Sequence, residues 1–167
     1  MSKTLIKISG FLSILFGVFW IALTLLGFVY LLSNGESGMV QADAVVKLCN
    51  IFINCWFNPA KRILNFESAP QNTDIYFWCI LMFVVMIIFI IAGIRFAVYA
   101  KPETDFSEKI GKVVMFAIFD AIMLAFFIHN FVQLGQTMVQ YVAYINFAVL
   151  GLLFALPVAQ CIRAQYD

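Results

Sequence analysis

The most unusual chemical group of this sequence is a single carboxylate, Asp120, inside the apolar run Val113–Val132 (VVMFAIFDAIMLAFFIHNFV). A charge at that depth in a bilayer costs roughly a few kcal/mol, so such groups normally face a bundle interior, a wet cavity or a cation. Arg95 lies near the end of the preceding apolar run, at a similar distance from the charged segment that separates the two runs. We therefore predict that Arg95 pairs with Asp120, within one chain or between copies.

Two roles are open for this ion pair. It fixes the register of a helix bundle, or it changes partners between two states, as a gate or relay would. Asn146, near the middle of the last apolar run, extends the same set of intramembrane polar residues. Its amide favours hydrogen bonding between helices, with Asp120 or with another copy, and pore lining is the alternative.

The other candidate residues are small or polar. Small residues recur every fourth position on the last two apolar runs, which is typical of closely packed helices. They are Ala117, Ala121 and Ala125, followed by Gly151, Ala155 and Ala159. His129, with Gln133 and Gln140, predicts a polar cluster near the outer end of the third run. A metal or haem would require further strong ligands, so we predict no metal and no cofactor.

Catalytic residue sets are not apparent in the sequence. There is no HExxH motif, phosphate loop or paired general acid and base. The four cysteines, Cys49, Cys55, Cys79 and Cys161, include no CxxC pair, which disfavours a thiol oxidoreductase. The sequence therefore predicts a protein that is not an enzyme.

The composition indicates a membrane protein. Of 167 residues, 64% are hydrophobic and 11% are charged, whereas soluble domains contain about 25% charged residues. The apolar residues occur in runs of about 20 or more, long enough to cross roughly 30 Å of hydrocarbon. A net charge of +1 provides no basic surface for nucleic acid, so we expect no direct nucleic-acid binding.

These runs predict an all-α, integral membrane four-helix bundle in one domain, residues 1–167. The spans are expected at about 8–32, 75–100, 113–134 and 137–160. The loop 33–74 is predicted to be extracytoplasmic and to contain an amphipathic helix at about 39–57. The loop 101–112 is predicted to be cytoplasmic, and Asp105 and Glu108 have the spacing of a capping box at the start of the third helix.

The positions of lysine and arginine set the expected orientation. With the N-terminus inside, seven of the ten basic residues lie on or near the inner side, which favours cytoplasmic N- and C-termini. We expect the protein in a membrane, a bacterial inner (plasma) membrane in particular. In size, span number and short termini, the chain resembles small bacterial four-span proteins, among them membrane subunits of two-gene antiphage systems such as Kiwa and pore-toxin immunity proteins. This likeness concerns architecture alone and implies no site residues.

Two functions follow from these patterns. The first is a non-enzymatic, oligomeric scaffold, anchor or sensor subunit, which binds itself or a partner protein at the cytoplasmic face and acts in bacterial stress or antiphage defence. The alternative is a small oligomeric ion or proton channel or transporter subunit that uses Asp120, Arg95 and Asn146. The low polar content of the spans disfavours the alternative.

Overall fold

The computed structural model describes residues 3–32, 72–134 and 140–166. These residues form four long α-helices and one short 3₁₀ helix, and they contain no β-strand. The elements in chain order are α1 (Thr4–Leu32), α4 (Asn72–Tyr99), η2 (Ser107–Lys109), α5 (Ile110–Leu134) and α6 (Gln140–Tyr166). Each α-helix contains a stretch long and apolar enough to cross a membrane. Because hydrocarbon offers no hydrogen-bond partners, a continuous helix satisfies the backbone of such a run.

For the described residues, the prediction of an all-helical fold with four helices apolar enough to span a membrane is thus confirmed. The first three of these helices begin about one turn before the predicted spans, since Thr4, Asn72 and Ile110 are their first residues. The last helix continues to Tyr166, beyond the predicted end at residue 160. The predicted amphipathic helix at about 39–57 lies outside the described residues.

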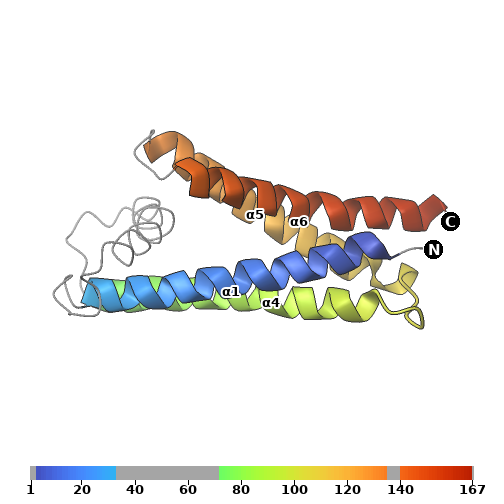
Figure 1. Ribbon diagram of the computed structural model, residues 1–167, viewed down its shortest axis with the longest axis horizontal. Helices are drawn as coiled ribbons and strands as arrows, with labels where there is room; N and C mark the ends of the chain where they lie inside the picture. The colour runs from blue at the N-terminus through green and yellow to red at the C-terminus, as the bar shows by residue number, and fades with distance from the viewer. Residues whose placement is uncertain (1–2, 33–71, 135–139, 167) are drawn as a thin grey trace.

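The helices form two antiparallel pairs, α1 with α4 and α5 with α6 (Figure 1). Both ends of the described chain lie at the same end of the molecule, as an even number of crossings requires. Contacts between α1 and α6 join the two pairs. Each helix therefore has at least one long neighbour that covers part of its surface.

Aromatic side chains fill the space between the two helix pairs. Phe89 of α4 contacts Phe116 of α5 at a ring-centroid distance of 5.5 Å, and Phe96 contacts the same ring at 5.1 Å. Trp20 of α1 contacts Phe127 of α5 at 5.6 Å. Edge-to-face and tilted ring pairs at these distances contribute about 0.5–1.5 kcal/mol each beyond the area they bury. Side-chain packing, rather than close backbone approach, therefore holds α5 against the first pair.

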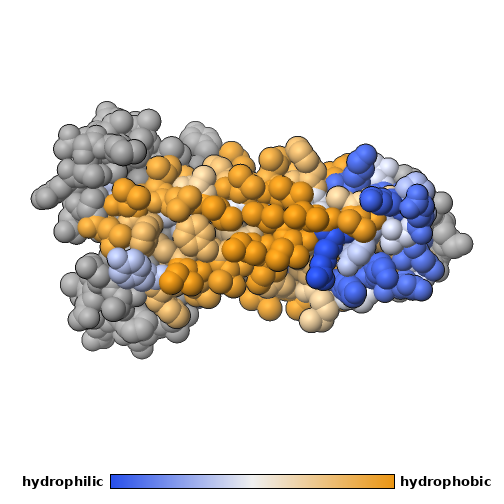
Figure 2. Space-filling view, turned by 90° about the horizontal axis from the view of Figure 1, so that it is seen from below, coloured by the Kyte–Doolittle hydropathy of each residue, from blue (hydrophilic) through white to orange (hydrophobic). Residues whose placement is uncertain are grey.

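The outer surface of the helices is apolar. Large hydrophobic side chains on all four helices are exposed, for example Phe11, Ile80, Met115 and Ile145. Figure 2 shows one face, on which a continuous hydrophobic band covers the middle and hydrophilic residues gather at the end with the termini. A band of this kind would be unstable in water and is the surface expected against lipid. The structure therefore supports a membrane location.

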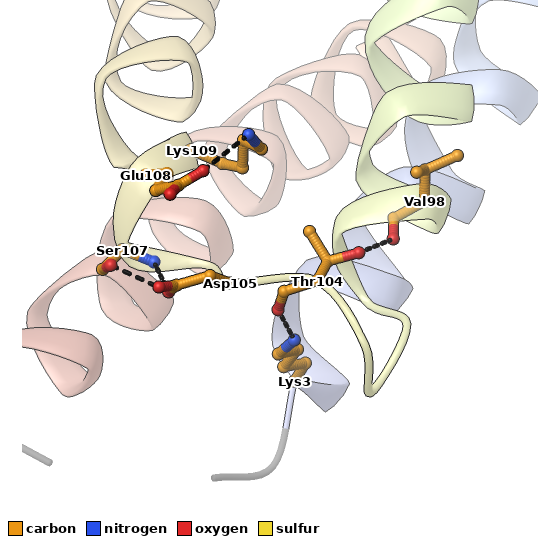
Figure 3. Close-up of polar contacts among 7 residues, drawn as sticks. All are labelled: Lys3, Val98, Thr104, Asp105, Ser107, Glu108 and Lys109. Carbon is orange, nitrogen blue, oxygen red and sulfur yellow. Dashed lines mark hydrogen bonds and ion pairs between the residues drawn. The ribbon is translucent and has the colours of Figure 1, made fainter.

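A short polar turn precedes the third spanning helix. The Asp105 carboxylate accepts hydrogen bonds from the Ser107 backbone N–H at 2.9 Å and from the Ser107 hydroxyl at 2.8 Å (Figure 3). Glu108, the other residue of the predicted capping box, instead pairs with Lys109 at 3.2 Å. The N-cap residue of η2 is Phe106, and no side-chain capping bond is present there, so the predicted capping box is not formed and Asp105 stabilises a local turn instead.

Candidate functional site

Asp120 lies on the inward face of α5. The buried residues of this helix recur at steps of three and four, which is the spacing of one helix face. They are Val113, Phe116, Ala117, Asp120, Met123 and Phe127. The Asp120 side chain is fully buried, and neither carboxylate oxygen has a hydrogen-bond partner among the described residues. It is the most unusual polar group of the described bundle, because buried carboxylates are normally paired or hydrogen-bonded.

Arg95 does not meet Asp120 in the described chain. Arg95 is exposed on α4, whereas its neighbour Phe96 is 2% exposed and belongs to the core. Successive residues of a helix point about 100° apart, so Arg95 faces outward where Phe96 faces inward. Asp120, in contrast, is buried on α5, so the two side chains do not face each other. The predicted ion pair is therefore absent within the chain, and the pairing between copies remains a prediction.

Asn146 joins α6 to α1. Its Oδ1 accepts a hydrogen bond from Trp20 Nε1 at 3.1 Å, and both side chains are buried. Trp20 is held further by its ring contacts with Phe16 and Phe127. Asn146 thus forms a hydrogen bond between helices, although its predicted partners were Asp120 or another copy and not Trp20. A signal was available, because an indole N–H in the middle of a span must find an acceptor.

Three small polar side chains of α1 share its buried face with Trp20. They are Ser9, Ser13 and Thr24, each fully buried. Ser13 donates a hydrogen bond to the Phe89 carbonyl of α4 at 2.6 Å, and Thr24 donates to the Trp20 carbonyl at 2.7 Å. The Ser9 hydroxyl has no partner among the described residues. This polar stripe was missed, although its spacing of four to seven residues marks a single helix face.

The closest helix approach lies between α1 and α4, not along the predicted alanine and glycine seams. A Cβ at Gly10 would lie 2.8 Å from the Gly93 carbonyl oxygen, and a Cβ at Gly93 would lie 2.6 Å from the Gly10 carbonyl oxygen. A Cβ at Gly17 would lie 2.6 Å from the Ile90 side chain. Glycine at these positions lets the two backbones touch, as small residues do in membrane bundles.

The predicted seams have mixed environments. On α5, Ala117 is buried, Ala121 is half-buried and Ala125 is exposed. On α6, a Cβ at Gly151 would meet nothing within 4 Å. Ala155 is exposed and Ala159 is half-buried. Within one chain, only the start of the α5 seam faces the core, and contact of the α6 seam with another copy remains a prediction.

The outer polar cluster is described only at His129, which is exposed. The side chains of Gln133 and Gln140 lie outside the described set. Cys79 and Cys161 are buried free thiols. Among the described residues, no group of three or more His, Cys, Asp or Glu side chains is placed to hold a metal ion.

The end of the molecule that carries the termini is polar, and there Lys3 connects the start of the chain to the loop 101–106. Its ammonium donates to the Lys101 carbonyl at 2.7 Å. It also donates to the Thr104 carbonyl (Figure 3). The Thr104 hydroxyl donates to the Val98 carbonyl at 3.1 Å. The two Ser107 hydrogen bonds, the side-chain bond first, lower the pKa of Asp105 below its usual value. A recess of about 1040 Å³ opens here between the start of the chain, the 101–107 loop and Ala164 of α6.

Comparison of the chain with protein-family models, curated proteins and solved structures gives no match. The described residues define an all-helical protein with four helices able to span a membrane. Its distinctive internal features are one enclosed carboxyl group and one Trp–Asn bridge. Any function must be argued from these features.

Proposed function

We propose that this chain is a non-enzymatic membrane sensor subunit, whose helix bundle responds to the protonation of Asp120 and passes that response to a partner protein. The observation that carries the proposal is the complete burial of an Asp120 carboxyl group without a hydrogen-bond partner among the described residues. A charged carboxylate is costly in such a place, so the closed bundle favours the neutral acid. Ionisation then favours a bundle that has opened to water or to a cation.

The burial of Asp120 limits what can neutralise it. Arg95 is exposed on another helix, and a second copy or a lipid headgroup would meet only the outside of the closed bundle. A proton needs no cavity, so it fits the closed state without displacing a helix. Among the described residues, Asp120 is the one acidic or basic side chain that is buried.

The polar end provides a route from Asp120 to a partner. Asp120 lies on α5, which follows directly after η2 and the loop that Lys3 holds. A displacement of α5 would therefore change the loop and the recess beside it. We place the partner at this end, where exposed charged side chains such as Lys101, Glu103 and Glu108 offer polar contacts.

A bacterial inner membrane with both termini in the cytoplasm is part of the same proposal. It is supported by the excess of lysine and arginine on the side of the termini. A role in stress or antiphage defence rests on likeness of architecture and awaits the identity of the partner.

The alternative function, conduction through an oligomer, finds less support. Arg95 is exposed, Asp120 is enclosed and Asn146 is bonded to Trp20. The three residues thus have three different environments in the described chain. A conduction path would require an arrangement between copies that brings them together.

The first test determines what the particle contains. The protein is extracted from its native membrane in mild detergent, and the mass of the intact particle is measured. We expect a mass that includes further copies or a second protein. A monodisperse single chain without a companion would contradict the subunit proposal.

The second test measures the response itself. In nanodiscs, hydrogen exchange of the loop 101–106 is compared between pH 5 and pH 9 after correction for the intrinsic rate. We expect faster exchange at high pH in the wild type and no such change in Asp120→Asn, which cannot ionise. His129→Gln is the matched control, because it removes the single histidine of the sequence, whose side chain is exposed. An equal pH response in Asp120→Asn would refute the sensor mechanism.

A further inference from the structure

A small cavity lies between α1 and α6 within the membrane-spanning part of the molecule. Its volume is about 330 Å³, at the lower end of the range for small-molecule sites. Its walls are apolar or aromatic except at Asn146. An apolar cavity with a single amide is the usual composition of a site for a small apolar ligand.

The Trp20 hydrogen bond fixes the orientation of the Asn146 amide. Because an indole N–H can only donate, the atom 3.1 Å from Trp20 Nε1 must be the acceptor Oδ1 of Asn146. The Nδ2 amide group is therefore left as a donor, and no described residue accepts a hydrogen bond from it. Asn146 is 7% exposed. Asn146, a residue that lines the cavity, thus offers a donor for which no described residue is the acceptor.

The cavity is accessible from lipid rather than from water. Three of its lining residues, Leu15, Phe19 and Ile145, are about half-exposed or more on the outer surface. Trp20 lies about 24 Å by helical rise from the start of α1 and about 18 Å from its end, near the middle of that span. A ligand would therefore enter from the bilayer and place its acceptor close to the midplane.

We propose that this cavity binds a lipid-soluble molecule that carries a carbonyl oxygen on a ring, the chemistry of a membrane quinone. The carbonyl accepts a hydrogen bond from Asn146 Nδ2, and the ring lies against the aromatic side chains of Phe19 and Trp20. Ester carbonyls of phospholipids lie at the edge of the hydrocarbon layer, so their depth does not match that of Asn146. The site is separate from Asp120, and the proposal does not depend on the sensor mechanism.

Trp20 provides the readout for a binding test. In a Trp56→Phe/Trp78→Phe background it is the sole tryptophan of the chain. The full-length protein in nanodiscs is titrated with decylubiquinone, and tryptophan fluorescence is recorded. We expect saturable quenching, and about tenfold weaker binding in Asn146→Leu, because one hydrogen bond is lost. Decylbenzene has no carbonyl. It is therefore expected to compete with decylubiquinone only weakly, and to the same extent in the wild type and in Asn146→Leu.

Two variants of α6 separate binding in the cavity from partition into the bilayer. Val149→Phe fills the cavity that Val149 lines and is expected to abolish saturable quenching. Leu152→Phe adds the same ring at an exposed position outside the cavity and is expected to leave binding unchanged. Thermal unfolding of each variant establishes that it is folded. If Val149→Phe does not fold, the difference in quinone affinity between the wild type and Asn146→Leu tests the proposal instead.

Two results would overturn the proposal. The first is quenching that rises linearly with quinone concentration and is equal in the wild type, Asn146→Leu and Val149→Phe. This result would show that the quinone only partitions into the lipid. In a separate arm, phospholipids with brominated acyl chains replace the quinone. The proposal is overturned if these lipids strongly quench Trp20 fluorescence, if Val149→Phe removes this quenching, and if decylubiquinone does not reverse it. The cavity would then bind a lipid acyl chain instead.

Discussion

Two buried polar side chains of this bundle differ in how they are satisfied. The Asn146 oxygen has the Trp20 indole as its donor, whereas neither Asp120 oxygen has a partner among the described residues. A buried hydrogen bond contributes about 0.5–1.5 kcal/mol, while a buried group left unpaired costs about 1–3 kcal/mol. The hydrogen bond between Trp20 and the Asn146 oxygen therefore stabilises the closed bundle, whereas the unpaired Asp120 carboxyl group destabilises it.

Replacement of Asp120 tests this destabilisation. We expect Asp120→Leu to raise the free energy of unfolding by about 1–3 kcal/mol, because it removes an unpaired polar group from the core. Asp120→Asn keeps the shape and a polar amide, so we expect a smaller change. Unfolding by SDS titration in mixed micelles measures both. A loss of stability in Asp120→Leu would show that Asp120 has a stabilising partner in the assembled protein.

Asp105 is predicted to titrate at a lower pH because of Ser107. The Ser107 hydroxyl is the larger cause of the lowered pKa of Asp105, and the Ser107 backbone N–H is the second. We expect Ser107→Ala to raise the pKa of Asp105 part of the way to its usual value. An NMR titration of the carboxyl carbon measures the change, and Glu103, exposed in the same loop, is the internal control.

The sign of the pH effect follows from the direction of this shift. Since folding lowers the pKa of Asp105, its contribution to stability is present above the unfolded-state pKa and is lost as the pH falls through the folded-state value. The turn formed by Asp105 and Ser107 is therefore expected to loosen in acid. An unchanged Asp105 titration in Ser107→Ala would contradict the hydrogen bond between these two side chains.

At the scale of the helices, α1 and α4 form the closest pair. Gly10 and Gly93 face each other across their interface, and each would bring a Cβ against the carbonyl oxygen of the other. Backbone atoms cannot rotate away as a side chain can, so added volume must separate the helices. The fit of these two glycines explains why α1 and α4 lie side by side (Figure 1).

Alanine substitution of these glycines is expected to weaken the pair. We expect Gly10→Ala or Gly93→Ala to destabilise the bundle by about 1–3 kcal/mol, the usual effect of overpacking. Gly151→Ala is the matched control, because its Cβ meets nothing within 4 Å. It should be neutral or stabilise by about 0.5–1 kcal/mol through its higher helix propensity. Equal effects at Gly10 and Gly151 would contradict the described interface.

Hydrophobic runs were sufficient to predict the helices but not their mutual orientation. Run length gave the four spans to within about two turns at their ends, because the hydrocarbon thickness fixes how many apolar residues are needed. The direction of a side chain depends on which helix face is buried, and four uniformly apolar helices do not reveal that face.

The same limit explains the packing residues. Spacing of four picked out Gly151 and Ala155 on α6, although a Cβ at Gly151 would meet nothing within 4 Å and Ala155 is exposed. The close approach at Gly10 and Gly93 was not predicted. Small residues are common throughout membrane helices, so their presence is a weak signal. The pair of Trp20 and Asn146 would have indicated a helix contact more strongly than the small residues do, since a buried hydrogen-bond donor requires an acceptor.

At the scale of the whole molecule, the ends of the described chain and the loop 101–106 lie together. In a Cys-free background, we expect cysteines at Glu103 and Arg163, both exposed, to react with a membrane-impermeant maleimide from the same side. A cysteine between Leu32 and Asn72 should react from the opposite side. Labelling of positions 103 and 163 from different sides would contradict four crossings.

The α1–α4 interface also constrains how the protein is made. The hydrogen bond from Ser13 to Phe89 spans 76 positions of the chain, and at about 5–20 residues per second the ribosome takes about 4–15 s to produce that length. During this delay the newly inserted first helix presents Ser9 and Ser13 without α4 beside them. An insertase or chaperone that shelters this surface until α4 emerges would therefore raise the yield of correctly assembled protein.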